Sequence, residues 1–495
     1  MNVTPLEVTD ERSLYEQVAD RIQALISEGT LQPGDRLPSV RKLREQLSVS
    51  VSTVMEAYRL LEDRGLISAR PQSGYYVKTA IACPMEPDQS TPPKQALAVD
   101  TSLAFRFSRT SHRSDGLIQL GAAIPPFELL PMANLNRLMG QVLRQNSATA
   151  HSYDLPPGNE QLRHEIARRM MTVGCSTTPD QIMITNGTLE AVYVALKAIT
   201  KPGDTVAIES PTYYGFLETL EVLHLKALEL PTHPRDGLSL TALESALQNQ
   251  QIAACLLVSN FSNPLGSCMS DLKKKQLVEL LTQYQVPLVE DDIYGELYFE
   301  GVRPKAIKAF DRDDWVLYCS SFSKTLSPGL RVGWCVAGRY QSKVEQLKWV
   351  INHTTSLANQ LTVAAFLANG GYDRHLRQLR RTYQFQMGRV IQAICDYFPA
   401  ETRVTRPDGG HVLWVELPGC DALQLYEEAL SYGIGIAPGV MFSPSKSYGH
   451  CFRLNTGIIW SPEVDQALQT IGYLTKRQLA LKILNHDAPP PMARR

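Results

Sequence analysis

The 495-residue chain has no hydrophobic run that approaches the roughly 18 residues of a membrane-spanning helix. Its nine cysteines form no CxxC pair and no zinc-ligand spacing, so we expect reduced, buried thiols and no metal site. The net charge is −1 and the isoelectric point is near 6.8, so no overall field favours nucleic acid or a membrane surface. The first residues, MNVTPLEVTDERS, are polar and acidic and do not resemble a signal peptide. We therefore expect a soluble, cytoplasmic protein in which any DNA binding depends on a local patch.

The chain is too long for one ordinary domain, and its 44% apolar content is sufficient for sizeable cores. We divide it into a compact helical unit at 1–80, a linker at 81–115, an α/β unit at 116–485 and a disordered tail at 486–495. The linker prediction rests on the stretch CPMEPDQSTPPKQ, which is rich in proline and polar residues and has little to bury. No internal repeat is visible.

The first unit has the pattern of three helices followed by a β-hairpin. The first helix is predicted to stop at Gly29, the second to have Pro38 at its first position, and the third to have Ser50 as its N-cap. Gly74 is predicted to lie in the turn of the hairpin. The apolar residues at helical spacing are Val18, Ile22, Leu25, Ile26, Val54, Ala57, Tyr58 and Leu61. This order of elements suggests a winged helix-turn-helix.

Two features of this unit suit nucleic acid. Ser52 and Thr53 are short hydroxyl residues in the first turn of the third helix, where they can contact phosphates or base edges. A basic cluster at the second helix consists of Arg36, Arg41, Lys42 and Arg44. Basic and acidic residues nearly balance across 1–80, so charge alone leaves an ordinary solvated face as an equal alternative.

The stretch LQPGDRLPSVRKLREQLSVSVSTVMEAYRLLEDRGLISARPQSGYYV resembles the GntR family of winged-helix regulators. The resemblance implies that Arg41, Ser52, Thr53 and the wing around Gly74 contact operator DNA. Many relatives carry an arginine early in the recognition helix, where this chain has Val51. That departure removes one phosphate or guanine contact and puts the specificity or affinity in doubt.

The larger unit alternates short apolar runs with helical stretches. The apolar runs are QIMIT, TVAIE, AACLLV, PLVED and VLYCS. This alternation predicts an α/β fold with a mixed, mostly parallel sheet and crossover helices. Lys324 follows the last of these runs, among serines and ahead of a Pro-Gly turn and an arginine, in CSSFSKTLSPGLRVGW. A lone lysine is usually a solvated surface residue, whereas a lysine beside a phosphate site can be an amine nucleophile.

Five other positions are ambiguous when each is taken alone. Gly187 opens a helix after a strand, and Tyr213 follows a proline turn. Asn263 precedes a Pro-Leu-Gly turn, and Asp291 ends the apolar strand VPLVE with Tyr294 three residues later. Together with Lys324 they meet the needs of pyridoxal 5′-phosphate. The ring nitrogen needs a carboxylate, the 3′-oxygen needs neutral donors, the phosphate needs an arginine, hydroxyls and amides, and the aldehyde needs a lysine.

Residues 116–480 resemble the fold-type I aminotransferases of class I/II, with the motifs in family order. The resemblance implies that Lys324 forms the internal aldimine, that Asp291 pairs with the pyridine nitrogen and that Tyr213 stacks on the ring. Asn263 and Tyr294 would hydrogen-bond the 3′-oxygen. The implied catalytic residues are Lys324, Asp291 and Tyr294. The implied phosphate ligands are the side chains of Thr188, Ser321, Ser323 and Arg331 and the backbone of Gly187 and Leu189.

The family pattern extends to two further residues. Tyr153, in YDLPPGNEQLR, matches a tyrosine that reaches the phosphate of a neighbouring subunit, which implies a homodimer. Arg453, in CFRLNTG, matches an arginine that clamps a substrate carboxylate, and a structural salt bridge is the alternative. Ser320 lies outside the matching positions and is expected to be a strand-end hydroxyl. Leu189 replaces a polar side chain of several relatives, which puts only a side-chain contact in doubt.

A GntR-like reader joined to an aminotransferase-like domain resembles the MocR subgroup of regulators. The resemblance implies a transcription regulator that senses pyridoxal 5′-phosphate, an amino compound, or both, through Lys324. A symmetric homodimer would present two reading units to two half-sites of operator DNA. The alternative is a working aminotransferase in which the winged helix is secondary. An intact site does not separate the two, because sensing and transamination use the same groups.

Overall fold

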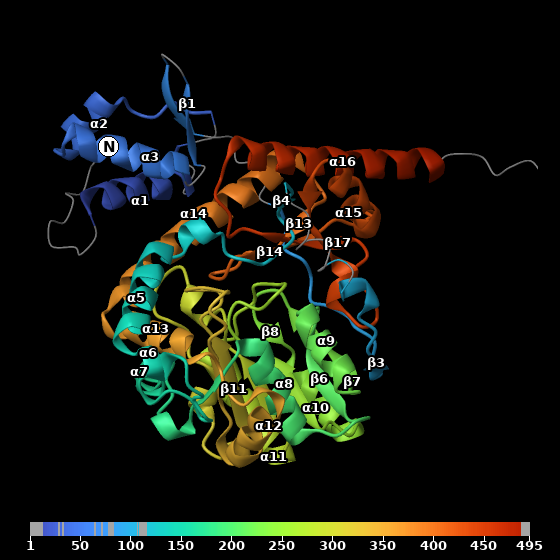
Figure 1. The fold of residues 1–495 in the computed structure, drawn as a ribbon. Coiled ribbons are helices and arrows are strands. Elements are labelled where there is room, and N and C mark those ends of the chain that lie inside the picture. Colours follow the sequence, from blue (N-terminus) through green and yellow to red (C-terminus); the bar gives the residue numbers. More distant parts are fainter. Residues whose placement is uncertain are drawn as a thin grey trace, which may run out of the picture.

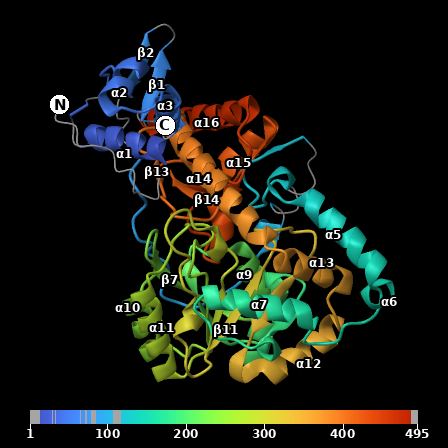
Figure 2. The same ribbon diagram turned by 90° about the vertical axis from the view of Figure 1, so that its left-hand side faces the viewer.

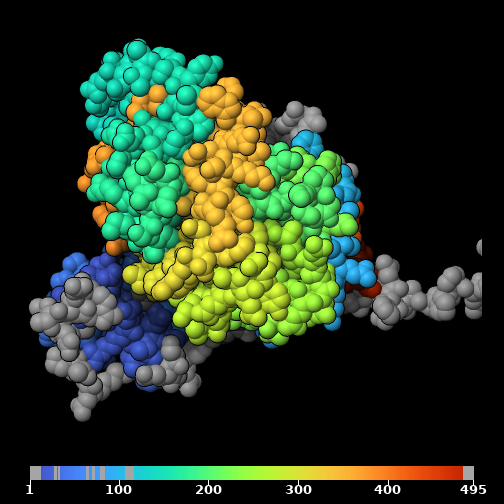
Figure 3. Space-filling view, turned by 90° about the horizontal axis from the view of Figure 1, so that it is seen from below, coloured from blue at the N-terminus to red at the C-terminus, as the bar shows by residue number. Residues whose placement is uncertain are grey.

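The structure is a computed structural model, and it describes residues 13–27, 30–31, 34–63, 66–70, 73–77, 84–105, 107 and 116–486. A small N-terminal unit lies beside a larger α/β unit (Figures 1 and 2). Both views place the small unit at the end of the molecule that carries helices α14 and α16, away from α11 and α12. In the view from below, the small unit forms a separate lobe (Figure 3).

The N-terminal unit has the predicted order of elements, and the winged helix-turn-helix prediction is confirmed. Its elements are α1 (Leu14–Ser27), α2 (Val40–Leu47), α3 (Val51–Asp63), β1 (Ile67–Arg70) and β2 (Gly74–Val77), with β1 and β2 antiparallel. The predicted apolar face of α3 forms the centre of the core, because Val54, Ala57, Tyr58 and Leu61 are each 0% exposed. These side chains pack against Val18 and Ile22 of α1.

The helix ends of this unit differ from the prediction at one position. Pro38 is not the first residue of α2, because Ser39 caps the helix and its hydroxyl accepts the N–H of Lys42 at 3.3 Å. A serine can satisfy a free N–H at the helix start and a proline cannot, so the cap takes the serine. Ser50 caps α3 as predicted, accepting the N–H of Thr53 at 3.0 Å. The predicted helix end at Gly29 lies outside the described residues.

Residues 84–105 do not form the free linker that their composition predicts. Strand β3 (Leu97–Ala98) pairs with β7 (Lys226–His233) at the edge of the large sheet. Glu86 forms an ion pair with Arg235 at 2.5 Å, and Asp88 forms one with Arg403 at 2.7 Å. The segment has few apolar side chains to bury, so edge pairing and ion pairs hold it instead. Composition does not reveal the edge pairing or the ion pairs, because both depend on partners more than 100 residues away in the sequence.

The large unit is built on a nine-stranded sheet of order β3-β7-β6-β9-β10-β11-β12-β5, with β8 paired to β7. Strands β7, β6, β9, β10 and β11 run parallel, and β12 is antiparallel to both of its neighbours, so the mixed, mostly parallel sheet is confirmed. All five predicted strands are present. The strands are β5 (Met183–Thr185), β6 (Thr205–Ser210), β8 (Gly237–Leu238), β9 (Ala254–Leu257), β10 (Leu288–Asp291), β11 (Val316–Ser321) and β12 (Gly333–Val336).

Helices cover both faces of this sheet (Figures 1 and 2). The α-helices are α5 (Met132–Gln145), α6 (Ser147–Ala150), α7 (Glu160–Thr172), α8 (Thr188–Ile199), α9 (Tyr214–Val222), α10 (Leu240–Asn249), α11 (Asp271–Tyr284), α12 (Gln341–Asn352), α13 (Leu357–Ala368) and α14 (Gly371–Tyr397). Short 3-10 helices are η1 (Phe127–Leu129), η2 (Pro179–Gln181), η3 (Gly295–Leu297), η4 (Ile307–Phe310) and η5 (Gly338–Tyr340). The carboxyl ends of the parallel strands meet at one edge, which is where open α/β sheets build sites.

A second, four-stranded antiparallel sheet of order β13-β14-β17-β16 lies above that edge. Its strands are β13 (Arg403–Val404), β14 (Val412–Glu416), β16 (Ala437–Pro438) and β17 (Cys451–Asn455). Beside it, β4 (Ile118–Gln119) and β15 (Ile434–Gly435) pair in parallel. The remaining elements are α15 (Ala422–Ser431), η6 (Gly439–Phe442) and α16 (Pro462–His486). No helix of the described residues is both long enough and apolar enough to cross a membrane. Residues 487–495 of the predicted tail lie outside the described residues.

Candidate functional site

Lys324 lies just after β11, and its side chain points to the junction of the two sheets. Its Nζ donates to the backbone carbonyl of Ala123 at 2.6 Å. Burial, together with the charges of Arg453 and Arg331, lowers the pKa of Lys324 from 10.5 to about 8, while the charge of Asp291 opposes the shift. An amine with a pKa near 8 is partly unprotonated at neutral pH, which is the form that attacks a carbonyl.

Asp291 is the last residue of β10 and is 4% exposed. Its Oδ1 accepts the N–H of Ile293 at 3.0 Å. Burial, helped by the charges of Asp292 and Glu290, raises the pKa of Asp291 from 3.8 to about 8 against the lowering effects of the Ile293 hydrogen bond and the charge of Lys324. The carboxyl group is therefore poised to ionise when a cationic partner enters the site.

Three polar side chains from distant segments form a hydrogen-bonded chain beside Asp291. Asn263 donates to the hydroxyl of Tyr294 at 3.4 Å and accepts from Arg453 Nη1 at 2.8 Å. Arg453 is 1% exposed, its Nη2 donates to the carbonyl of Gly121, and its Nε has no partner. Among the residues that the structure describes, Arg453 contacts amide and carbonyl oxygens and no carboxylate. The alternative of a structural salt bridge is therefore not what holds this arginine.

A cluster of hydroxyl groups lies at the start of α8. Thr188 Oγ1 donates to Ser321 Oγ at 2.8 Å, and Ser321 Oγ lies 3.1 Å from Ser323 Oγ. Arg331 lies beside them, with Nη1 3.5 Å from Ser323 Oγ and Nη2 donating to the carbonyl of Asn186 at 2.6 Å. A helix start, three hydroxyls and an arginine together form a site suited to an anion.

Two residues of this anion site have positive φ angles. Gly187 has φ +91°, and a Cβ at this position would collide with the guanidinium of Arg331. Arg331 itself has φ +51°, a conformation that costs a non-glycine residue about 1–2 kcal/mol. Strain of this kind persists where the surrounding structure demands one geometry, and it is typical of ligand sites. Leu189 is 39% exposed, so its side chain makes no buried contact here.

The two remaining residues predicted from the aminotransferase pattern lie in different settings. Tyr213 caps α9, and its ring packs at a tilt against Tyr214, with centroids 4.8 Å apart. Tyr153 lies apart from the cluster, on the segment before α7, and its side chain is 78% exposed. Ser320 is buried and donates to the backbone carbonyl of Asp292 at 3.1 Å, which is the strand-end role expected of it.

Sequence reasoning missed His411, which the structure places beside Tyr294. The centroids of the two rings are 5.6 Å apart, and His411 Nδ1 lies 3.0 Å from Asn455 Oδ1. His411 is fully buried, and burial together with the charges of Lys324 and Arg453 lowers its pKa to about 3. It is therefore a neutral imidazole at this site. Its local context, GGHVLWVEL, is that of an ordinary strand start and carries no signal of a site.

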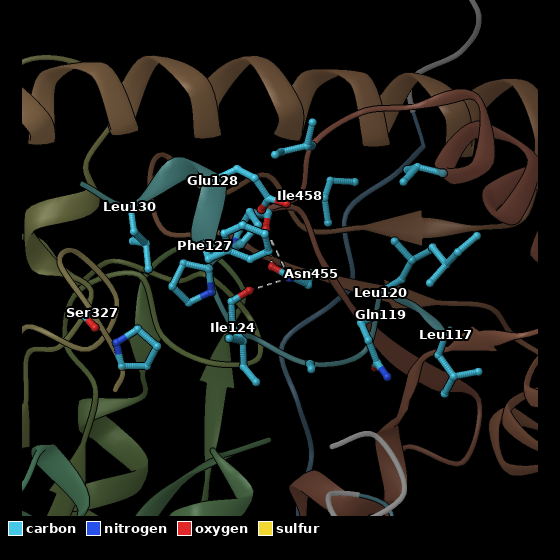
Figure 4. A pocket seen from close by; sticks show the side chains of 18 of the residues that line it. Leu117, Gln119, Leu120, Ile124, Phe127, Glu128, Leu130, Ser327, Asn455 and Ile458 are labelled. Carbon is cyan, nitrogen blue, oxygen red and sulfur yellow. Dashed lines mark hydrogen bonds between the residues drawn. The ribbon is translucent and has the colours of Figure 1, made fainter. Parts of the chain in front are cut away.

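A cavity of about 820 Å³ lies in the large unit. It lies between the segment 117–132 and the end of β17, and Asn455 Nδ2 donates across it to the carbonyl of Ile124 at 3.3 Å (Figure 4). Its lining is mainly apolar and includes Leu117, Leu120, Ile124, Phe127, Leu130 and Ile458. Ala123, which accepts from Lys324, lies between the lining residues Ala122 and Ile124, and Lys324 itself is not part of the lining.

Three of the predicted DNA-contacting residues, Arg41, Ser52 and Gly74, are exposed on the N-terminal unit, and Thr53 is half-buried. The side chain of Arg41 is 89% exposed and lies 3.7 Å from Glu45. Ser50 Oγ lies 2.7 Å from Ser52 Oγ and 2.8 Å from Thr53 Oγ1, so the three hydroxyls form one group at the start of α3. Gly74, at φ +103°, begins β2 rather than lying in the turn itself.

Comparison with known proteins identifies both units. Residues 116–471 match the family model of aminotransferase class I and II. The chain belongs to this family. Residues 14–77 match the gntR family of bacterial regulatory proteins, so a GntR helix-turn-helix domain is fused to a class I/II aminotransferase domain. This is the MocR-type organisation.

Two relatives of this aminotransferase-family chain match 94% of its length. It is 43% identical over 467 residues to the uncharacterised HTH-type transcriptional regulator YdcR of Escherichia coli, covering 94% of this chain and 99% of that one. It is 37% identical to YjiR of the same organism, also described as an uncharacterised HTH-type transcriptional regulator, with coverage of 94% and 99%. The solved structure of LysN, the α-aminoadipate aminotransferase of Thermus thermophilus, has a TM-score of 0.71 and 28% identity, covering 76% and 97%.

Proposed function

We propose that this protein is a DNA-binding transcriptional regulator that binds pyridoxal 5′-phosphate and responds to the cofactor, to an amino compound, or to both. One observation carries the proposal: the charges of Asp291, Arg453 and Arg331 all act on the buried amine of Lys324, in a chain that also has a winged helix-turn-helix. Full-length relatives that are described as transcriptional regulators support the regulatory part.

The side chains present fit the cofactor. In this proposal the Lys324 amine would hold the cofactor by condensing with its aldehyde and releasing water, and the Asp291 carboxylate would pair with the ring nitrogen. Asn263 and Tyr294, already linked at 3.4 Å, take the 3′-oxygen. When bound, the cofactor supplies an electron sink for the bonds of an attached amine. LysN, which is 28% identical, was solved with N-(5′-phosphopyridoxyl)-L-leucine, and this supports a cofactor site in the same fold.

The anion site is proposed to hold the cofactor phosphate. Thr188, Ser321 and Ser323 supply hydroxyls, Arg331 supplies a charge, and the start of α8 supplies backbone N–H groups. The glycine at position 187 lets the guanidinium of Arg331 lie directly against the backbone of the turn, where a side chain would displace it. Tyr213 would stack on the cofactor ring.

Arg453 is proposed to hold the carboxylate of the amino compound. It is almost fully buried, and its Nε has no partner, so one donor is available for a ligand. The exposed setting of Tyr153 suits a contact with the phosphate of a second subunit in a homodimer. Two reading units in one dimer would then contact two half-sites of operator DNA through Arg41, Ser52, Thr53 and the wing at Gly74.

A working aminotransferase is the second candidate, and the completeness of the site favours it. Lys324 can move a proton at the α-carbon of a bound amine, because its pKa near 8 allows both protonation states at neutral pH. Asp291 can keep the ring nitrogen protonated. The same groups would serve a ligand sensor as well as an aminotransferase. The N-terminal helix-turn-helix is therefore the feature that favours a regulator.

Two parallel measurements separate the candidates. One is a gel shift with the DNA upstream of the protein's own gene, with and without cofactor. The other is the absorbance of the bound cofactor during titration with a panel of amino acids. We expect a shift that cofactor or amine changes. Multiple turnovers of amino group transfer, with no shift on any DNA tested, would instead support the enzyme.

A further inference from the structure

An ion pair between Lys348 and Glu190, whose side chains are 2% and 11% exposed, supports the turn that precedes the anion site. Glu190, the third residue of α8, accepts the backbone N–H of Asn186 with Oε2. Arg331 donates to the carbonyl of Asn186 at 2.6 Å. The Asn186 backbone is therefore held on both sides, directly before Gly187. Glu190 thus fixes the turn from the side opposite Arg331.

Lys348 holds the Glu190 carboxylate in place. Its Nζ lies 3.1 and 3.2 Å from the two carboxylate oxygens, 2.7 Å from Asn352 Oδ1 and 3.2 Å from Thr355 Oγ1. Asn352 Nδ2 also donates to Glu190 Oε1. Lys348 is 1% exposed, and α12 carries it toward the start of α8. The charged groups of this cluster are satisfied by one another.

Burying an ion pair costs free energy, so a contribution to the stability of the fold does not explain why Glu190 and Lys348 are paired here. Removing two charges from water costs several kcal/mol per ion in real proteins, and apolar replacements of such pairs are often neutral or stabilising. The position of the Glu190–Lys348 pair beside the anion site gives a better explanation for its presence. A carboxylate is the strongest acceptor for fixing the Asn186 N–H, but a bare negative charge beside an anion site repels the anion. Lys348 removes this repulsion, because its positive charge neutralises Glu190 while the Glu190 oxygen still accepts the Asn186 N–H.

We propose that Glu190 and Lys348 are positioning residues for phosphate recognition: Glu190 fixes the Asn186–Gly187 turn, and Lys348 neutralises Glu190 so that the turn accepts a phosphate dianion. This inference rests on the proposed binding of pyridoxal 5′-phosphate. The Glu190–Lys348 pair contacts the turn and does not contact the amine of Lys324. We therefore expect it to affect the affinity for the ligand's phosphate group and not the reaction with its aldehyde.

The test compares pyridoxal 5′-phosphate with pyridoxal, which lacks the phosphate, by the absorbance of the bound aldehyde in the full-length protein. In Lys348→Met, Glu190 keeps an unpaired charge beside the anion site. We expect the dissociation constant for pyridoxal 5′-phosphate to rise at least about tenfold and that for pyridoxal to change less than about twofold. The rise should shrink in high salt.

Glu190→Gln is the matched variant, because the amide oxygen can still accept the Asn186 N–H while the negative charge is gone. It should bind pyridoxal 5′-phosphate as tightly as the wild type or more tightly, which is the opposite sign to Lys348→Met. A purely structural role predicts weaker binding of both ligands by both variants. Equal losses for pyridoxal and its phosphate in Lys348→Met would therefore overturn the inference.

The double variant Glu190→Gln/Lys348→Met keeps the inference testable if Lys348→Met fails to fold. It carries no buried charge, and it should show a ratio of the two ligand affinities within about threefold of the wild-type ratio. A loss of more than about tenfold in that ratio would contradict the role of charge cancellation. Failure of the wild-type protein to bind pyridoxal 5′-phosphate at all would refute the proposed function instead, so the two failures are distinguishable.

Discussion

The guanidinium of Arg453 donates to the side-chain oxygen of Asn263 at 2.8 Å, and this contact ties the small antiparallel sheet to the large one. Arg453 lies on β17, and Asn263 follows β9. Because Asn263 also donates to Tyr294, the arginine belongs to the same hydrogen-bonded chain as the strand end that carries Asp291. A ligand that binds Arg453 on the small sheet would therefore be linked through Asn263 to the large sheet.

Arg453→Lys should reduce the response to amino acids selectively. Lysine keeps the charge but loses the two-pronged geometry that matches a carboxylate. We expect the cofactor absorbance change to need at least about tenfold more amino acid, while the matching decarboxylated amine needs less than about twofold more. Equal losses for the acid and the amine would show that Arg453 does not bind the carboxylate.

The reaction of Lys324 with the cofactor should depend on pH in a defined window. The unprotonated amine is the nucleophile, and a pKa of about 8 places its appearance well below the usual 10.5 of lysine. The rate of covalent cofactor uptake should therefore rise between about pH 7 and 9 and then level off. Stopped-flow absorbance measures this rate, with Lys324→Arg as the inactive control. A rate that is still climbing steeply above about pH 9.5 would rule out the lowered pKa.

Gly187→Ala should weaken cofactor binding much more than it weakens the fold. The new Cβ would collide with Arg331 and disturb the anion site. Gly203→Ala is the matched control, because Gly203 has φ +92° and no atom within 4 Å of the added Cβ. Alanine at positive φ introduces a similar backbone strain in both variants, so their melting temperatures should fall by similar small amounts. Only Gly187→Ala should lose about tenfold or more in affinity for pyridoxal 5′-phosphate, and equal affinities in the two variants would contradict the assignment of the phosphate site.

Arg41→Ala should weaken operator binding and leave cofactor uptake unchanged. The side chain is 89% exposed and its ion pair with Glu45 is long, so its removal costs the fold little. If it contacts a phosphate, the slope of log affinity against log salt should fall by about 1. Arg374→Ala, an exposed arginine on α14, is the control and should change neither quantity. An unchanged salt slope in Arg41→Ala would remove this residue from the DNA interface.

Local pattern was sufficient to predict most of the fold. The strands from β5 to β11 that were expected are present, because short apolar runs between helical stretches indicate buried parallel strands. The apolar face of α3 and the cap at Ser50 also followed from spacing and residue type. Pro38 was misplaced, because a proline and a serine stand in succession there and either can start a helix.

Long-range partners could not be predicted in the same way. The ion pairs of Glu86 and Asp88 fasten residues 84–105, whose composition indicates a free linker. Glu190 and Lys348 are 158 residues apart and each looks like an ordinary charged helix position. His411 meets Tyr294 only after two sheets have packed together. Pairings of this kind depend on the assembled fold, and a single sequence carries no signal for them.

Chemical trapping of the cofactor is the most direct test of the proposal. The protein is saturated with pyridoxal 5′-phosphate, reduced with borohydride, digested and mapped by mass spectrometry. The reduced adduct should lie on Lys324 alone, with the buried lysines Lys274 and Lys348 unmodified. An adduct on either of those lysines, or no adduct in cofactor-saturated protein, would contradict the proposed chemistry of the site.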